Sequence, residues 1–270
     1  MGMKNILVHL DNSSATVDRL DLAVRLARKH NAHLCGLYVI SHQYYQPRHI
    51  SEQNSLESME SLFTRKCAEA GISSQWSAID WTVIGVSLTE IVNMRAYYSD
   101  LVIVGQTDFN GPNRSLAPEM PERLVLASGR PVLIVPYAGT FEHIGDRIMI
   151  AWKAGREATR AVNDAMPCLK LANHVSVVGV SSGSTELVDT DAVFAEVRNH
   201  LGRHGVTAET ELISAGNFPI GDMLLNRASD NTIDMLVMGA YAHTRRGTLD
   251  LSPVARHVLK HMTVPVLMSH

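Results

Sequence analysis

The sequence predicts an α/β protein in which two doubly wound domains follow each other along the chain. Short apolar runs alternate with helical patterns, as in parallel sheets that are covered by helices on both faces. The runs DLVIVG at 100–105 and PVLIVP at 131–136 recur as DMLVMG at 234–239 and VPVLM at 264–268. The separation of Gly105 from Gly239 equals that of Pro131 from Pro265, 134 positions. The same domain is therefore expected twice.

The first domain, residues 1–138, is expected to contain five strands that alternate with four helices. The cluster Asp11-Asn12-Ser13-Ser14 is suited to capping the first helix. Val17, Leu20, Val24 and Ala27 follow at helical spacing and predict its buried face. Strands are expected at 5–10, 33–40, within 74–84, at 100–105 and at 131–136, and the later helices at 51–70, 88–98 and 121–129.

A linker is expected at 139–145, and the second domain at 146–270. Its strands are predicted at 147–153, 174–180, 206–213, 234–239 and 264–268. Its helices are predicted at 156–172, 191–204, 220–229 and 249–261, with Pro167 bending the first of them. A loop rich in small and basic residues is expected between 240 and 248. Ligands of such sheets bind at the carboxyl ends of the strands, here after Leu10, Val104, Trp152 and Met238.

Composition and charge exclude several classes of function. The chain has 270 residues and a net charge of −3, so no global positive field favours nucleic acid. No apolar run reaches the roughly 18 residues of a membrane span, and the first residues do not have the pattern of a signal peptide. Three scattered cysteines, Cys35, Cys67 and Cys168, suggest a reducing compartment. We expect a cytoplasmic protein without nucleic-acid or membrane partners.

Several of these runs together carry a resemblance to a known family. They are ILVHLDNS at 6–13, DLVIVG, PVLIVP, IMIAWKAGREATRAV at 148–162, DMLVMGAYAHTR at 234–245 and VPVLM. In order and spacing the chain resembles the universal stress protein family in its tandem two-domain form. The resemblance implies a flavodoxin-like, five-stranded parallel sheet in each half. It also implies that the halves pair through their last strands as a pseudo-dimer, which could pair again into a homodimer.

The resemblance also implies where a nucleotide would bind. Many members of the family hold ATP on the loop after strand four. The sequence of that loop is Gly-x-x-Gly, then a spacer, then Gly followed by Ser or Thr. An Asp at the end of strand one also helps to hold the nucleotide. Glycines let backbone N–H groups approach phosphate, and the next helix N-terminus adds partial positive charge. In the first half Asp11 and Gly105 match. Asp108 stands at the second glycine, and Pro118 with Glu119 stands at the closing pair.

The second half departs from the pattern at other positions. Gly239 matches the first glycine and is followed by Ala240, but Ala242 replaces the second glycine and Lys153 replaces the strand-one Asp. Ser252 and Pro253 stand at the closing pair. His243, Arg245, Arg246 and Thr248 could supply cationic or hydroxyl donors instead. We predict no ATP site of the usual family type in either half. If a nucleotide binds nevertheless, the candidate nucleotide-binding residues are Asp11, Gly105, Gly239, Ala240, His243, Arg245, Arg246 and Ser252.

No catalytic or metal-binding constellation is evident in the sequence. The pairs His200 with His204 and His257 with His261 have helical spacing, but no neighbouring acid or cysteine in the sequence completes a metal shell. We predict a stress-response binding or regulatory protein without catalytic activity. Two alternatives remain: an ATP- or AMP-binding protein with slow ATP hydrolysis, or a dimerisation module that binds a protein through its sheet edges or loop 106–120.

Overall fold

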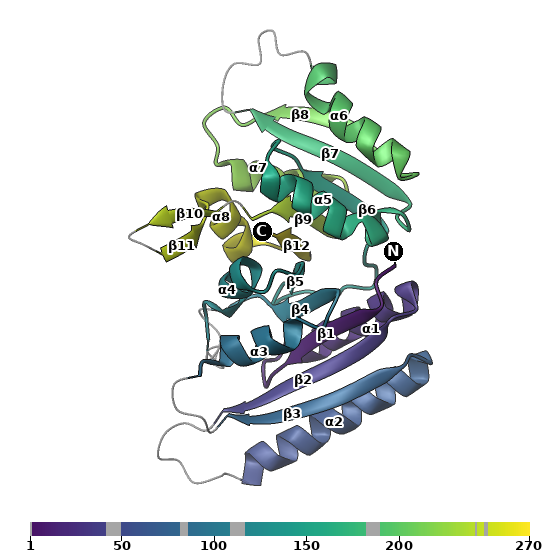
Figure 1. The fold of residues 1–270 in the computed structure, drawn as a ribbon, viewed down its shortest axis with the longest axis vertical. Coiled ribbons are helices and arrows are strands. Elements are labelled where there is room, and N and C mark those ends of the chain that lie inside the picture. Colours follow the sequence, from purple (N-terminus) through teal and green to yellow (C-terminus); the bar gives the residue numbers. More distant parts are fainter. Residues whose placement is uncertain are drawn as a thin grey trace. The chain divides into compact units, whose positions relative to one another are not determined.

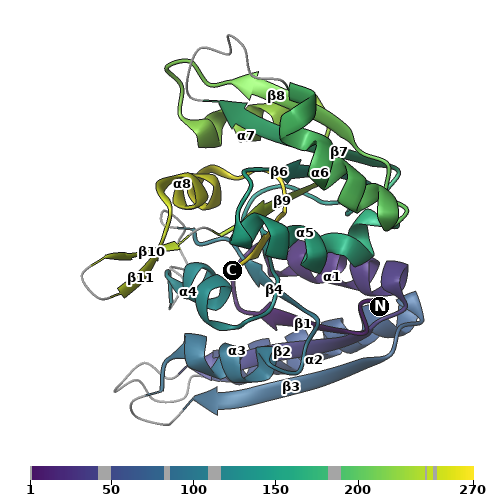
Figure 2. The ribbon, with the colours of Figure 1, turned by 45° about the horizontal axis from the view of Figure 1, so that its top comes forward.

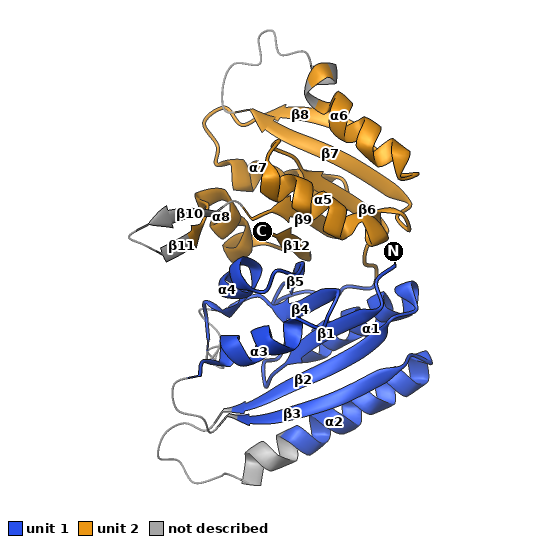
Figure 3. Cartoon of the chain, in the orientation of Figure 1, with its two compact units in different colours: residues 1–142 blue, residues 143–270 orange. Residues whose placement is uncertain are grey.

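The computed structural model describes residues 2–41, 50–81, 86–108, 117–181, 190–240, 242–245 and 248–270 (Figure 1). The chain divides into two compact units, residues 1–142 and 143–270 (Figure 3). Each unit alternates strands with helices, so the predicted α/β class is confirmed. In the part of the chain that the structure describes, no helix is both long and apolar enough to cross a membrane.

The first unit contains a sheet of parallel strands in the order β3-β2-β1-β4-β5. The chain order reverses between β1 and β4, which makes this the switch point where ligands of doubly wound folds bind. Its strands are β1 (Asn5–Leu10), β2 (His33–Ser41), β3 (Ser74–Trp81), β4 (Leu101–Gly105) and β5 (Val132–Val135). Its helices are α1 (Thr16–His30), α2 (Ile50–Ala70), α3 (Leu88–Ala96) and α4 (Met120–Ala127).

Helices cover both faces of this sheet, α1 and α2 on one and α3 and α4 on the other (Figure 2). Strands β1 and β4 lie between these layers and are therefore apolar on both faces, as near-continuous hydrophobic runs predict. Ile6, Val8 and Ile103 are completely buried. The carboxyl ends of β1 and β4 lie side by side, which positions the candidate site of this unit.

The second unit repeats this plan with the parallel strand order β12-β9-β6-β7-β8 and the switch point between β6 and β9. Its strands are β6 (Arg147–Ala151), β7 (His174–Ser181), β8 (Glu209–Ser214), β9 (Met235–Gly239) and β12 (Val266–Ser269). Its helices are α5 (Arg156–Leu169), α6 (Thr190–Arg203), α7 (Ile220–Asp230) and α8 (Pro253–His261). A separate antiparallel hairpin joins β10 (Ala242–Arg245) to β11 (Thr248–Leu251).

The two units also repeat a polar contact that fixes their first strand. The Asp100 carboxylate, just before β4, accepts hydrogen bonds from the backbone N–H groups of Lys4 and Asn5 at 2.7 and 2.9 Å. The Asp234 carboxylate, just before β9, accepts equivalent bonds from Asp146 and Arg147, at 2.9 and 3.1 Å to one oxygen. Each aspartate thereby aligns the central two strands of its sheet.

Two sequence predictions are wrong in detail. The buried face of α1 is formed by Thr16, Arg19, Leu20, Leu22, Ala23, Leu26 and Ala27, whereas Val17 is 42% exposed. The face is displaced because two polar residues of the first turns point inward to a buried polar cluster. The helix predicted at 249–261 begins only at Pro253, because residues 248–251 pair with 242–245 as the β10–β11 hairpin.

Candidate functional site

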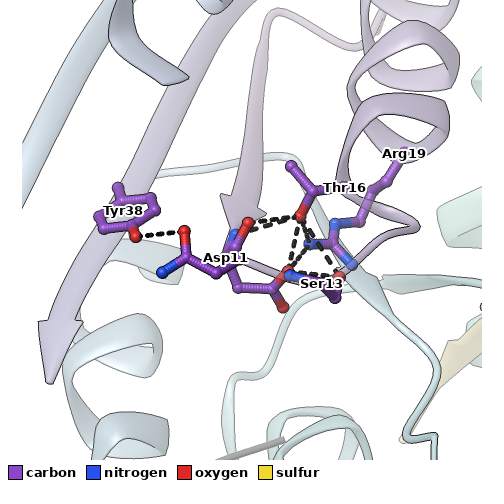
Figure 4. Close-up of polar contacts among 6 residues, drawn as sticks. Asp11, Ser13, Thr16, Arg19 and Tyr38 are labelled. Atoms are coloured by element: carbon purple, nitrogen blue, oxygen red, sulfur yellow. Dashed lines mark hydrogen bonds and ion pairs between the residues drawn. The ribbon is translucent and has the colours of Figure 1, made fainter. Parts of the chain in front are cut away.

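The candidate site of the first unit lies where β1 ends and α1 begins (Figure 4). One carboxylate oxygen of Asp11, Oδ1, accepts four hydrogen bonds. The donors are the backbone N–H of Ser13 at 3.0 Å, the Ser13 hydroxyl at 2.5 Å, the Thr16 hydroxyl at 2.6 Å and Nη2 of Arg19 at 2.8 Å. The predicted role of the 11–14 cluster as a side-chain helix cap is wrong. Residue Ala15 occupies the cap position and no side chain bonds there.

Arg19 is the buried partner of this carboxylate. Its side chain is 2% exposed, whereas that of Asp11 is 38% exposed. Burial by itself raises the pKa of Asp11, but Arg19, His9 and the hydroxyls of Ser13 and Thr16 outweigh it and hold the pKa well below its usual range. Asp11 is therefore an ionised hydrogen-bond acceptor at neutral pH.

His9, on the same strand, is the third titratable group of the cluster. It is 3% exposed, and burial lowers its pKa to about 4 despite the nearby Asp11 carboxylate. Its Nδ1 atom has no hydrogen-bond partner among the described residues. At neutral pH the cluster consequently contains one anion, one cation and one neutral imidazole.

Arg19 also links Asp11 to Gly105, the first glycine of the loop after β4. A β-carbon built at Gly105 would overlap Nη1 of Arg19. The two matched residues of the first half thus come together, but the guanidinium lies against both. Gly105 has a packing reason to be glycine here, because its missing side chain makes room for Arg19.

The rest of the loop after β4 makes contacts within the chain. The buried Gln106 accepts a hydrogen bond from the backbone N–H of Tyr137 at 3.2 Å, and the Thr107 hydroxyl donates to the carbonyl of Pro118 at 2.6 Å. Glu119 occupies the N-cap position of α4 without a side-chain cap bond. Most of the loop 106–120, which the sequence proposes as a protein-binding segment, lies outside the described residues.

In the second unit, packing within the fold also accounts for Gly239. A β-carbon at Gly239 would lie 2.5 Å from the carbonyl carbon of Glu157 and would overlap the backbone nitrogen of Ala158. The first turn of α5 therefore crosses directly over the end of β9. Ala240 is fully buried, and its N–H donates to the carbonyl of Ser269 at 2.8 Å. Ala240 is therefore closed off within the fold, and the side of Gly239 that a β-carbon would occupy is taken by α5.

The remaining candidates of the second half lie on the hairpin and at the start of α8. The Ser252 hydroxyl caps α8 by accepting a hydrogen bond from the N–H of Ala255 at 3.2 Å. His243 and Arg245 lie in β10, opposite Asp250 and Thr248 of β11. The expected loop is therefore a strand over these positions. Arg246 lies outside the described residues.

The two histidine pairs lie as helical spacing predicts. The ring centroids are 4.8 Å apart for His200 and His204 and 4.5 Å apart for His257 and His261. The structure adds an acid that the sequence does not reveal, because the Asp222 carboxylate lies 2.6 Å from Nε2 of His257. Within the described ranges, no group of three or more His, Cys, Asp or Glu is arranged to hold a metal ion.

Arg19 and Thr16 are the site residues that sequence reasoning missed. A signal for them exists: Arg19 stands three positions before Leu22 and seven before Leu26, so it belongs to the apolar stripe of α1. A cation within such a stripe requires a buried anion, and the sequence offers Asp11, eight positions earlier at the end of the first strand, as well as Asp18 directly before Arg19.

Comparison with known proteins gives a consistent likeness. The profile of the Universal stress protein family matches residues 2–136. A universal stress protein from Archaeoglobus fulgidus has 17% sequence identity and a TM-score of 0.73, and the match covers 98% of this chain and 97% of that chain. A functionally unknown protein from Pseudomonas aeruginosa has 18% identity and a TM-score of 0.66, with coverage of 99% and 92%.

A third structure extends the likeness of fold. The cytoplasmic domain of a prokaryotic cation chloride cotransporter has a TM-score of 0.54 at 13% identity, and the match covers 98% of this chain and 95% of that chain. A comparison with curated proteins gives no match. At these identities the solved structures establish a shared architecture over nearly the whole chain.

Proposed function

The chain belongs to the universal stress protein family, and we propose that it is a binding or regulatory member whose two nucleotide sites have degenerated and which catalyses no reaction. The observation that carries the proposal is that protein atoms lie against both matched glycines. Arg19 fills the space beside Gly105, and the first turn of α5 fills the space beside Gly239. Each glycine is thus accounted for by packing, without a phosphate contact.

The electrostatics of the first unit support the same proposal. The positive charge of Arg19 is already neutralised by Asp11 at 2.8 Å. A phosphate placed there would have to displace this carboxylate or lie next to it, and like charges at short range repel. The cluster around Asp11 therefore offers a bound triphosphate no unpaired cation that could neutralise its negative charge.

One observation favours the alternative of an ATP- or AMP-binding protein. All four hydrogen bonds to the Asp11 side chain fall on Oδ1, and among the described residues none falls on Oδ2. The side chain is 38% exposed, so Oδ2 could accept a bond from a ribose hydroxyl. This alternative predicts that nucleoside and nucleotide bind equally well, because the ribose and not the phosphate makes the contact.

Titration calorimetry with ATP, AMP and adenosine separates these functions. The degenerate-site proposal predicts no saturable heat up to about 1 mM, an affinity weaker than roughly −4 kcal/mol. Mass spectrometry of the freshly purified, denatured protein should release no adenine nucleotide. Micromolar ATP binding that Asp11→Asn abolishes, or phosphate release from ATP above the rate without protein, would contradict the proposal.

We extend the proposal to the second unit and to the assembly. The identical strand order and the 134-residue repeat support a tandem arrangement of two family domains. A pseudo-dimer within one chain, further pairing into a homodimer, and a cytoplasmic location remain parts of the proposal. Light scattering after gel filtration tests the homodimer, since a dimer has twice the 29.7 kDa mass of the chain. Cell fractionation tests the location.

A further inference from the structure

A groove on the first unit is lined by residues from the carboxyl end of β3 and from helix α3, away from the switch point between β1 and β4. Its volume is about 510 Å³, which lies within the usual range for small-molecule sites. We call it the Tyr98 groove. Its lining includes Ile79, Asp80, Met94, Arg95, Tyr97 and Tyr98.

The walls of the Tyr98 groove are apolar side chains that the fold leaves uncovered. Met94, in the last turn of α3, is 53% exposed, and Tyr98, just after the helix, is 82% exposed. Large apolar side chains gathered around a concavity are unusual on a surface unless something covers them. An aromatic ring is a suitable occupant, because it can stack on tyrosine and contact the soft methionine side chain.

The wall around Tyr97 is held in place before any ligand arrives. The Tyr97 hydroxyl accepts a hydrogen bond from Nδ2 of Asn93 at 3.1 Å, and its carbonyl accepts one from Nη2 of Arg130 at 2.6 Å. The other end of α3 is fixed by a capping box between Ser87 and Glu90. A preformed wall reduces the entropy that binding would otherwise cost.

The charges of the groove select the polar end of the occupant. Arg95 is exposed and lines the groove, so its guanidinium can reach a ligand anion bound there. Asp80 lines the same groove and adds a negative charge. A single carboxylate can bind Arg95, but a doubly charged phosphate would be repelled more strongly by Asp80.

We propose that the Tyr98 groove binds a small aromatic monocarboxylate, with its ring against Met94 and Tyr98 and its carboxylate on Arg95. This site lies outside the cluster around Asp11, so the proposal stands or falls independently of nucleotide binding. The proposed ligand is of a class that the loops after Gly105 and Gly239 are not expected to bind.

The test compares 1-naphthylacetate with its neutral isostere 1-naphthylacetamide by calorimetry on the full chain. We expect the anion to bind about tenfold more tightly, the effect of one charge-assisted hydrogen bond. Arg95→Met should remove this preference and leave amide binding unchanged. Asp80→Asn should tighten anion binding about twofold through relief of repulsion at an exposed position. Tyr98→Ser should weaken both probes several-fold.

Matched controls locate the effect in the groove. Arg203→Met removes an exposed arginine at the C-terminal end of helix α6 in the second unit. This control should leave the affinities for naphthylacetate and naphthylacetamide unchanged. In protein labelled with ¹³C-methyl methionine, the Met94 resonance, assigned with Met94→Leu, should shift on titration with naphthylacetate. Because Arg95 is exposed, Arg95→Met should unfold at the wild-type temperature. Equal affinity for the two probes, wild-type affinity in Arg95→Met or an unshifted Met94 resonance would overturn the proposal.

Discussion

The ion pair between Asp11 and Arg19 predicts an asymmetric loss of stability. Asp11→Asn leaves the guanidinium of Arg19, which is 2% exposed, without its anion. Such an uncompensated buried charge costs about 3 to 5 kcal/mol. Because the Asp11 side chain is 38% exposed and water can reach its position, we expect the lower end, about 3 kcal/mol.

The reverse substitution should cost less. Arg19→Met replaces the guanidinium with an apolar side chain in a buried position, and Asp11 keeps the Ser13 and Thr16 donors as well as access to water. We expect a loss of about 1 kcal/mol. The double variant removes both charges and should cost about 1 to 2 kcal/mol, well below the sum of the single changes.

Urea unfolding followed by tryptophan fluorescence reports on the first unit alone if the second unit carries no tryptophan. Trp152→Phe supplies that background, because the other two tryptophans, Trp76 and Trp81, lie in the first unit. For a denaturant slope of about 2 kcal/mol per molar, Asp11→Asn should lower the midpoint by roughly 1.5 M. Additive losses in the double variant, or an equal or larger loss in Arg19→Met, would refute the reasoning.

The pKa of Asp11 also determines the pH range over which the wild type and Asp11→Asn should differ in unfolding free energy. The pKa of Asp11 is held below its usual value, so its contribution is complete above the pKa of an unfolded aspartate, about 3.9. That contribution is lost only as the pH falls through the lower, folded-state value. The gap between the wild type and Asp11→Asn should therefore be unchanged between pH 5 and 8.

Three further predictions concern single side chains. His9, with a pKa lowered to about 4 by burial, stays neutral in the folded chain while the unfolded chain takes up a proton below about pH 6.5. Unfolding free energy should fall by about 3 kcal/mol between pH 7 and 4 through this group; a urea series in which His9→Gln keeps the wild-type slope would contradict it. Gly239→Ala forces a β-carbon against the backbone of α5 and should cost about 3 kcal/mol; thermal unfolding measures the loss, and a loss below about 1 kcal/mol would argue against this packing. Ser252→Ala removes the α8 cap and should cost about 1 kcal/mol, measured by amide exchange in α8, with unchanged protection as the contrary result.

The order of elements could be read from the sequence because it depends on local signals. Apolar runs such as DLVIVG form strands buried on both faces, and their recurrence 134 positions later fixes a second copy. The β10–β11 hairpin was missed for a physical reason. Residues 242–245 lack strict alternation of polar and apolar side chains, so cross-strand pairing and not pattern makes them a strand.

The candidate site could be located from the sequence but not interpreted. Asp11 and Gly105 were identified because they match the positions at two strand ends that the family resemblance implies for a nucleotide site. The spacing of α1 placed Val17 on the buried face, yet this residue is 42% exposed and Arg19 is buried. Helical spacing alone cannot show which of two neighbouring helix faces is buried. A charged residue such as Arg19 can lie on the buried face when a carboxylate compensates its charge.

The α/β class, the alternation of strands and helices, the repeat and the positions of the two glycines can all be recognised from the amino-acid sequence. These features depend on residue type and spacing along the chain. The atoms that lie against each glycine depend on the folded arrangement: the guanidinium of Arg19 lies beside Gly105, and the first turn of α5 lies beside Gly239. Such contacts join residues that are distant in the sequence, and they arise only after the parallel strands have brought their carboxyl ends to one edge of the sheet.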